Sequence, residues 1–153
     1  MLTYHILYNP HAGSGRGQEA AYRLNALLPD DRLLFRDITE IDDYGAFFRS
    51  LRDDDRVVIA GGDGTLNRFI NDTIPLRTDC GIYYFATGSG NDFLRTYGTK
   101  EEFADLDAQL AGGEVTIDLL ETNLGLSATI CAAGLDAQVA YGIPKFRRIP
   151  LCG

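Results

Sequence analysis

Residues 56–65 read RVVIAGGDGT, and this stretch decides the fold. The apolar run at 56–60 contains β-branched residues and is typical of a strand buried on both faces of a sheet. Two glycines follow at once, and they allow the backbone to turn tightly and to approach a ligand closely. Asp63 then places a carboxylate at the end of the strand, and we expect Thr65 to cap the next helix. The stretch therefore predicts a strand, a ligand-binding turn and a helix, in that order.

The same alternation of elements continues on both sides of this stretch. Short apolar segments predict further strands at 3–8, 32–38 and 81–86. Apolar residues at helical spacing predict helices at 18–28, 44–51, 66–74, 92–97 and near 103–110. Alternating strands and helices are typical of a mostly parallel sheet with helices on both faces. We therefore predict an α/β fold, a three-layer α/β/α unit over residues 1–112.

Three glycine-rich clusters follow predicted strands: HAGSGRG at 11–17, GGDG at 61–64 and GSG at 88–90. Right-handed crossovers put the strand-to-helix loops of a parallel sheet at one edge, so we expect the three clusters to meet there. Ligands of open α/β sheets bind at that edge. Backbone N–H groups in glycine-rich turns and at helix N-termini bind anions, and the clusters therefore predict a phosphate site.

Each loop alone has a plainer interpretation. GGDGT could be a simple Asp-Gly turn, although its place after VVIA favours a ligand site. TGSGND at 87–92 either caps a helix or binds phosphate. NPHAGSGRG at 9–17 lacks the GKS or GKT of a Walker A loop and the spacing of GxGxxG. A carboxylate beside a phosphate site usually binds a divalent metal or accepts a proton, so Asp63 is the candidate catalytic and metal-binding residue.

Composition and charge argue against several functional classes. The 153 residues carry 14 Lys+Arg and 22 Asp+Glu, a net charge of −8, whereas nucleic-acid-binding domains usually carry a basic surplus. No apolar run is long enough to span a bilayer, and no secretory signal precedes the first predicted strand. The three cysteines form no CxxC and the two histidines cannot build a His-rich metal site. We expect a cytoplasmic protein without a nucleic-acid partner.

The pattern changes after residue 112. Residues 115–120 and 126–133 predict consecutive strands around a turn at 123–125, which is typical of an antiparallel β segment. The chain stops at 153, before such a unit could close, so we expect residues 113–153 to be the truncated start of a β-rich second domain. Unpaired strand edges favour self-association, and a homodimer would be one way to cover them.

Taken in order, NPxxGxG, GGDGT and a GTGNDF-like loop resemble the signature of the diacylglycerol kinase catalytic domain family. That family includes bacterial lipid kinases and sphingosine and ceramide kinases. The resemblance covers most of residues 3–141 and continues through IDLLETN and ATICAAGLDAQVA. It implies an α/β domain of the NAD kinase and diacylglycerol kinase type, a β-sandwich domain, and ATP bound between them. It also implies transfer of the γ-phosphoryl group of ATP, with Mg²⁺, to a lipid hydroxyl at a membrane surface.

The resemblance assigns site residues position by position. By this resemblance the segment 9–13 would line the nucleotide site, and the positions that match the family's nucleotide-binding residues are Asn9, Pro10, Gly13, Thr39, Gly61, Gly62, Gly64, Thr65, Ser89, Asn91 and Asp92. Asp63 would act through Mg²⁺ or its water shell. Ser89 stands where the family usually has Thr, and it keeps the hydroxyl. Thr39 matches a family threonine near ATP, and a helix N-cap before Glu40 is the alternative.

Two departures from the family pattern keep other functions open. The family usually reads GGDGTLNE, whereas Arg68 stands here in place of Glu. We interpret Arg68 as a solvated side chain, with a phosphate ligand as the alternative. The family's proposed general base and structural metal site lie in a later part that is not present here. One alternative is an NAD kinase or phosphofructokinase relative with a soluble acceptor, although the TGSGNDF motif argues against it. The other alternative is a non-catalytic nucleotide-binding remnant.

Two charged segments lie outside the three loops. Lys145, Arg147 and Arg148 alternate with apolar residues, so this segment either contacts an anionic bilayer, as in a peripheral membrane protein, or forms a solvated end. The acidic run at 53–55 is interpreted as a solvated helix end rather than a metal site.

Overall fold

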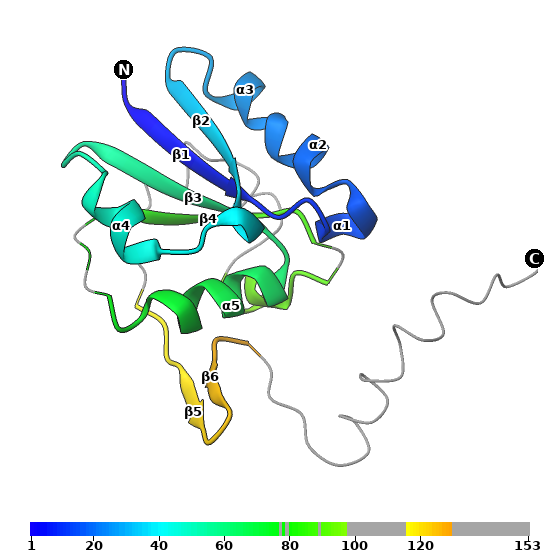
Figure 1. Ribbon diagram of the computed structural model, residues 1–153. Helices are drawn as coiled ribbons and strands as arrows, with labels where there is room; N and C mark the ends of the chain where they lie inside the picture. The colour runs from blue at the N-terminus through cyan, green and yellow to red at the C-terminus, as the bar shows by residue number, and fades with distance from the viewer. Residues whose placement is uncertain (77, 79, 89, 98–115, 130–153) are drawn as a thin grey trace, which may run out of the picture.

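A parallel sheet forms the framework of the protein (Figure 1). The structure is a computed structural model that describes residues 1–76, 78, 80–88, 90–97 and 116–129. Within these residues the sheet has the order β2–β1–β3–β4. Its strands are β1 (Thr3–Tyr8), β2 (Arg32–Asp37), β3 (Asp55–Gly61) and β4 (Ile82–Ala86). Neighbouring strands pair in parallel, as predicted, so their carboxyl ends share one edge.

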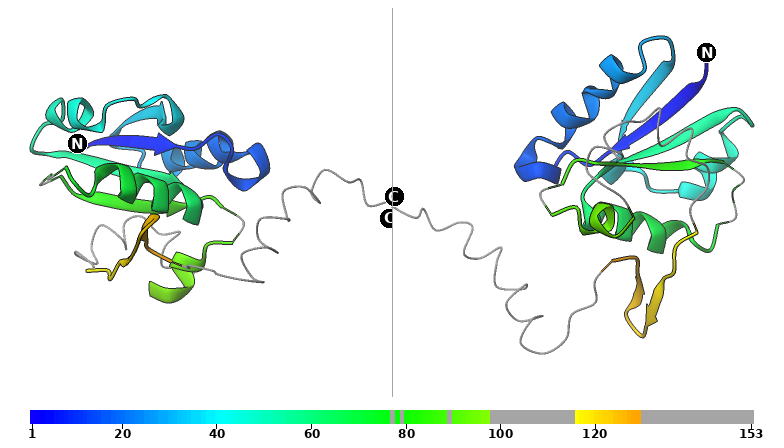
Figure 2. Two further views of the ribbon diagram at one scale, coloured as in Figure 1. Left: turned by 60° about the horizontal axis from the view of Figure 1, so that its bottom comes forward. Right: turned by 180° about the vertical axis from the view of Figure 1, so that it is seen from behind.

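Helices cover both faces of this sheet, as the two views of Figure 2 show. The helices of one face are α1 (Ala12–Gly15), α2 (Gly17–Tyr22) and α3 (Leu24–Leu27). Those of the other face are α4 (Tyr44–Arg49), α5 (Asp63–Thr73) and α6 (Asp92–Tyr97), and a 3₁₀ turn, η1 (Ile38–Glu40), precedes α4. The three-layer α/β/α prediction is therefore confirmed.

The sheet separates two apolar cores, because successive side chains of a strand point to opposite faces. Ile6 and Val58 pack with α2 and α3, whereas Leu7, Val57 and Ile59 pack with α4 and α5. All five side chains are fully buried. Burying each stabilises the fold by about 1.5–3 kcal/mol, which explains why the central strands read as nearly continuous apolar runs.

The helix ends differ from the sequence prediction in two places. The helix predicted over 18–28 is divided at Arg23, whose N–H bonds to the carbonyl of Ala20 three residues back and so tightens the turn. The N-cap of α5 is Gly62 in extended conformation, and Thr65 is a buried residue inside the first turn. The prediction that Thr65 caps this helix was wrong because its hydroxyl is bound elsewhere, as described below.

A short antiparallel hairpin follows the described part of the α/β unit. It consists of β5 (Leu120–Thr122) and β6 (Gly125–Ser127). Its turn is fixed by the Thr122 hydroxyl, which donates to the carbonyl of Gly125 at 2.9 Å and accepts from the N–H of Leu124 at 3.1 Å. The antiparallel segment was predicted, but its strands are shorter than expected. Residue 115, residues 130–133 and the helix predicted near 103–110 lie outside the described residues.

The acidic run before β3 ends in a buried side chain. Asp55 is 5% exposed, and its Oδ2 lies 3.1 Å from Nε2 of His5 and accepts the Arg52 N–H at 3.0 Å. Burial alone would raise the pKa of this carboxyl, but the contacts with Arg52 and His5 hold it below its ordinary value. The interpretation of residues 53–55 as a solvated helix end was therefore wrong for Asp55, although Asp53 and Asp54 are exposed.

None of the helices in the described ranges is both long and apolar enough to cross a membrane.

Candidate functional site

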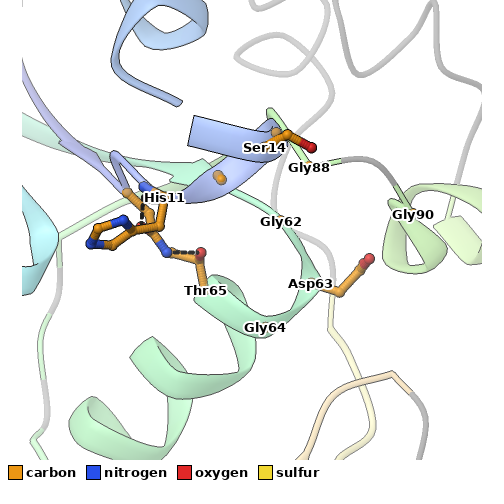
Figure 3. Close-up of a pocket in the computed structure, with 11 residues that line it drawn as sticks. His11, Ser14, Gly62, Asp63, Gly64, Thr65, Gly88 and Gly90 are labelled. Carbon is orange, nitrogen blue, oxygen red and sulfur yellow. Dashed lines mark hydrogen bonds between the residues drawn. The ribbon is translucent and has the colours of Figure 1, made fainter. Parts of the chain in front are cut away.

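The loops after β1, β3 and β4 meet at the carboxyl edge of the sheet and surround a pocket of about 360 Å³ (Figure 3). Residues of all three loops line it: Asn9, His11, Ala12, Gly13, Ser14, Gly62, Asp63, Gly64, Thr65, Gly88 and Gly90. The three glycine-rich clusters are thus brought together as the parallel topology predicted.

Asn9 joins the first loop to the second. Its Nδ2 donates to Oγ1 of Thr65 at 2.8 Å, and its Oδ1 accepts the N–H of His11 at 2.9 Å (Figure 3). Its own N–H donates to the carbonyl of Ala60 at 3.0 Å. The turn after β1 is therefore held against the start of α5 by both ends of one amide side chain.

Glycines allow the three backbones to approach one another at the floor of the site. A Cβ atom at Gly88 would lie only 2.6 Å from Cα of Gly62. Gly13 has φ +57°, and a Cβ there would lie 2.7 Å from the carbonyl oxygen of Thr87. Main-chain groups rather than side chains therefore surround this space, as in sites that bind anions through backbone N–H groups.

Asp63 is the first residue of α5, and its two carboxylate oxygens have different surroundings. Oδ1 accepts the N–H of Phe93 at 2.9 Å and so ties α5 to the start of α6. The carboxylate points toward Gly90 in Figure 3, and Oδ2 lies 3.3 Å from the position that a Cβ of Gly90 would take. Among the described residues, Oδ2 has no hydrogen-bond donor. One oxygen of Asp63 is thus anchored, and the residue lines the pocket.

A buried tyrosine supports the turn beneath Asp63. The Tyr84 hydroxyl donates to the carbonyl of Gly61 at 3.2 Å, and the N–H of Thr87 donates to the same carbonyl at 2.7 Å. Burial raises the pKa of Tyr84, and the nearby charge of Asp63 raises it further. Tyr84 therefore remains a protonated donor at neutral pH and keeps β4 fixed to the GGDG turn.

The structure places the predicted residues in three groups. Those that line the pocket are Asn9, Gly13, Gly62, Asp63, Gly64 and Thr65. Those that lie in the same loops without lining it are Pro10, Gly61, Asn91 and Asp92. Asn91 has φ +56° and donates from Nδ2 to the carbonyl of Gly88 at 3.0 Å, and Asp92 begins α6. Ser89 lies outside the described residues.

Thr39 lies in η1, after β2, and does not line this pocket. Its N–H and its hydroxyl both donate to Oδ1 of Asp37, at 2.8 and 2.7 Å. Asp37 is therefore the cap of this turn, and the alternative that Thr39 is a helix N-cap was wrong. The place of Thr39 near ATP stays a prediction.

Arg68 points away from the loops along α5. Its Nε lies 3.5 Å from Oδ2 of Asp72, and its side chain is 80% exposed. This contact supports the interpretation of Arg68 as a solvated side chain rather than as a phosphate ligand.

Three lining residues were not among the predicted site residues, namely Ser14, Gly88 and Gly90, whereas His11 and Ala12 lie in the predicted segment 9–13. All of them lie within the three quoted loops, so the loop pattern already contained the signal. Nearby, Oγ1 of Thr87 and Oδ1 of Asn91 are buried without a hydrogen-bond partner in the part of the chain that is described. Which of these groups face the pocket depends on contacts between loops, and the pattern of one loop does not contain that information.

Comparison with known proteins gives consistent matches. The diacylglycerol kinase catalytic domain family matches residues 3–122. The chain belongs to this family. A diacylglycerol kinase of Bacillus subtilis strain 168 is 30% identical over 98 residues, which are 63% of this chain and 32% of that protein. The crystal structure of a diacylglycerol kinase from Bacillus anthracis strain Sterne matches with a TM-score of 0.55 and 26% identity.

The region shared with the diacylglycerol kinase family contains the whole pocket, because it extends from β1 to β5. The match to the Bacillus anthracis structure covers 82% of this chain and 47% of that one. The chain therefore spans about a third of the curated relative and about half of the solved structure that it matches.

The pocket residues fit the ATP and the divalent metal that the diacylglycerol kinase family implies. The volume of about 360 Å³ is in the range of small-molecule sites, and the main chain of Gly62, Gly64 and Gly88 lines it without side chains that would fill the space. Among the described residues, no group of three or more His, Cys, Asp and Glu side chains could hold a metal. A Mg²⁺ ion beside Asp63 would therefore take most of its ligands from phosphate oxygens and water, as it usually does with nucleotides.

Proposed function

We propose that this chain is the nucleotide-binding half of a lipid kinase of the diacylglycerol kinase type. The observation that carries the proposal is Asp63, which lines a pocket of glycine-rich main chain and whose Oδ1 is anchored by the N–H of Phe93. Family membership and the names of the two Bacillus relatives support the same reaction. Residues 1–112 would form the nucleotide-binding domain and residues 113–153 the start of a β-rich second domain.

The residues of the chain have distinct tasks in this proposal. The backbone of the glycine turns and the N-terminus of α5 bind the phosphate groups, because both present N–H groups and positive potential. Asp63 holds Mg²⁺ directly or through its water shell, and the amide of Asn9 keeps the first loop in place. Bound Mg²⁺-ATP supplies the phosphoryl group that is transferred. Such a division of labour suits phosphoryl transfer, in which the protein contributes mainly positioning and electrostatic stabilisation.

The acceptor in the proposal is a lipid hydroxyl at a membrane surface. The protein would act from the cytoplasm as a peripheral enzyme. The basic residues Lys145, Arg147 and Arg148, which lie outside the described residues, are candidates for contact with an anionic bilayer.

Calorimetric titration with ATP in the presence and absence of Mg²⁺ tests the nucleotide site. We expect wild-type protein to bind Mg²⁺-ATP and Asp63→Asn to bind it about tenfold more weakly, which is the effect of losing one charge-assisted contact. Asp63→Asn keeps the oxygen that accepts the Phe93 N–H, so the loop geometry is retained. We further expect the variant to lose the preference for Mg²⁺-ATP over metal-free ATP.

Asp72→Asn is the matched control for that titration. It removes the same charge from the same helix, but Asp72 does not line the pocket and forms its ion pair with the exposed Arg68. We expect its affinity for Mg²⁺-ATP to stay within about twofold of wild type, as for surface changes away from a site. Equal losses in both variants, or no binding by folded wild-type protein, would contradict the proposed nucleotide site.

Single-turnover phosphorylation identifies the acceptor. The substrates are ATP labelled in its γ-phosphoryl group and either diacylglycerol or a sphingoid base in anionic vesicles, with NAD as the soluble alternative. A phosphorylated lipid supports the proposal. Phosphorylation of NAD alone indicates a kinase of a soluble substrate, and nucleotide binding without transfer to either acceptor indicates a non-catalytic nucleotide-binding module.

A further inference from the structure

Two asparagines of α5 bind the backbone of the β5–β6 hairpin, which lies beside this helix in Figure 1. Nδ2 of Asn71 donates to the carbonyl of Leu126, and Oδ1 of Asn71 accepts the N–H of the same residue, both at 2.8 Å. One helical turn earlier, Oδ1 of Asn67 accepts the N–H of Ala128 at 3.0 Å. The two side chains therefore occupy the place that a neighbouring strand would take beside β6.

The spacing of the two asparagines matches the spacing of a strand. Residues four apart on a helix are separated by about 6 Å along its axis, and residues two apart on a strand by about 6.6 Å. Asn67 and Asn71 consequently meet alternate residues of the extended backbone, whose peptide groups point to the same side. A shift of one residue would turn those groups away, so the contacts select one register.

The contacts also define a direction. Asn71 binds Leu126 whereas Asn67 binds Ala128, so the backbone runs antiparallel to α5. It therefore proceeds from the C-terminal half of the helix toward the end that carries Asp63. Gly125 makes this approach compatible with the helix, because it has φ +123° and a Cβ there would lie 2.7 Å from Oδ1 of Asn71.

Apolar burial contributes little to this docking. Leu120 and Leu124 of the hairpin are 56% and 93% exposed. Ile117, just before β5, packs on the core, and Ala128 is buried. Within the described ranges, the hairpin, whose Leu126 is only half-buried, is thus attached chiefly through hydrogen bonds to side chains of α5.

We propose that Asn67 and Asn71 form a docking clamp whose occupant is the chain's own segment 125–128. The clamp sets the register and the direction of the second, β-rich unit relative to the helix that carries Asp63. The asparagines are thus positioning residues for the unit that would complete the active site. Their relevance to phosphoryl transfer rests on the function proposed above, whereas the clamp rests on its contacts alone.

A pair of charge-matched variants tests the clamp. Asn71→Asp keeps the oxygen that accepts the Leu126 N–H, but it loses the donor to the Leu126 carbonyl and places a second carboxylate oxygen against that carbonyl. We expect this repulsion to displace the segment from the helix. Asn67→Asp adds the same charge to the same helix but keeps the oxygen that accepts the Ala128 N–H. In amide hydrogen exchange of the nucleotide-free chain, we expect Asn71→Asp to accelerate exchange at Leu126 and Ala128 at least tenfold. We expect Asn67→Asp to remain within about threefold of wild type, because its hydrogen bond survives.

A distance measurement reports positioning itself. Spin labels are attached to Leu124→Cys at the hairpin turn and to Ala26→Cys, which is exposed on α3 across the sheet, after the three native cysteines are replaced by serine. Pulsed dipolar spectroscopy should give one narrow distance distribution for the otherwise unaltered chain and for Asn67→Asp, and a broad one for Asn71→Asp.

The outcomes separate the clamp from the proposed function. A narrow distribution and slow exchange at Leu126 in Asn71→Asp would overturn the clamp, and so would equal broadening by both variants. Circular dichroism at the same pH verifies that Asn71→Asp is folded, and if it is not, Asn71→Ala replaces it with the same expectations. If the clamp behaves as expected while the chain fails to bind Mg²⁺-ATP, the clamp stands and the proposed nucleotide function fails.

Discussion

At the floor of the pocket, two residues without side chains pack against each other. Cα of Gly62 and the backbone of Gly88 are in contact, so any added carbon at Gly88 must displace main chain rather than a flexible side chain. Gly64 lies two residues away in the same turn, and a Cβ there would have no atom within 4 Å. Close packing therefore requires a residue without a side chain at Gly88 but not at Gly64.

Alanine substitutions at these two positions should have opposite effects. We expect Gly88→Ala to lower the free energy of unfolding by about 1–3 kcal/mol, as overpacking usually does. Gly64→Ala should raise it by about 0.5 kcal/mol, because alanine restricts the unfolded chain and favours the helix. Urea unfolding followed by circular dichroism measures both. A loss of stability in Gly64→Ala as large as that in Gly88→Ala would contradict the geometry.

At the scale of single elements, the ends of the helices depend on particular polar groups. α4 begins after Asp43, whose Oδ1 accepts the N–H of Ala46 at 2.8 Å. Its sequence neighbour Asp42 is also exposed and acidic but does not cap the helix. Because α4 has only six residues, its first turn is a large part of the whole element.

The two aspartates provide a direct test of this cap. We expect Asp43→Ala to reduce the free energy of unfolding by about 1 kcal/mol, the usual value of an N-cap. Asp42→Ala removes the same charge, and its effect should stay within about 0.5 kcal/mol, as for other surface positions. Chemical denaturation of the two variants in parallel measures the free energy of unfolding of each. Equal losses of stability would mean that the charge rather than the cap is responsible.

Most of the elements could be predicted from the sequence, because strands and helices depend on local apolar patterns. The pocket loops could also be located, because parallel topology brings them together. The particular partners could not be predicted. The hydroxyl of Thr65 is hydrogen-bonded to Asn9, which is 56 residues away, and the carboxylate of Asp55 contacts His5, which is 50 residues away. Likewise, the roles of Asn67 and Asn71 depend on the backbone of a distant strand. Such pairings become visible only when the chain is folded.

At the scale of the whole molecule, the two ends of the sheet serve different purposes. The pocket occupies the carboxyl edge, whereas the pair of His5 and Asp55 lies near the amino ends of β1 and β3. The pKa of Asp55 is below its ordinary value in the folded state, so the ionised carboxylate stabilises the fold. This contribution is complete above the unfolded-state pKa and is lost as pH falls through the lower pKa of the folded state.

Asp55→Asn should therefore change the response of the molecule to acid. We expect the wild type to lose stability relative to the variant as the pH falls below about 4, the ordinary pKa of an aspartate, because the carboxylate of Asp55 is then progressively protonated. Thermal unfolding across this range measures the difference. The affinity for Mg²⁺-ATP at neutral pH should be the same in both proteins, since Asp55 and Asp63 lie at opposite ends of β3. A parallel pH dependence in the two proteins would contradict the role given to Asp55.

The strand order β2–β1–β3–β4 has a consequence for the folding of the protein during its synthesis on the ribosome. β1 is made first, yet one of its two neighbours is β3, whose pairing begins at Asp55. At usual rates of synthesis, the roughly fifty residues between them take about 3–10 s to emerge. During that interval the apolar side chains of β1 have no complete core to enter. Chaperone binding to the nascent chain should therefore be strongest before β3 emerges and should decline once it has.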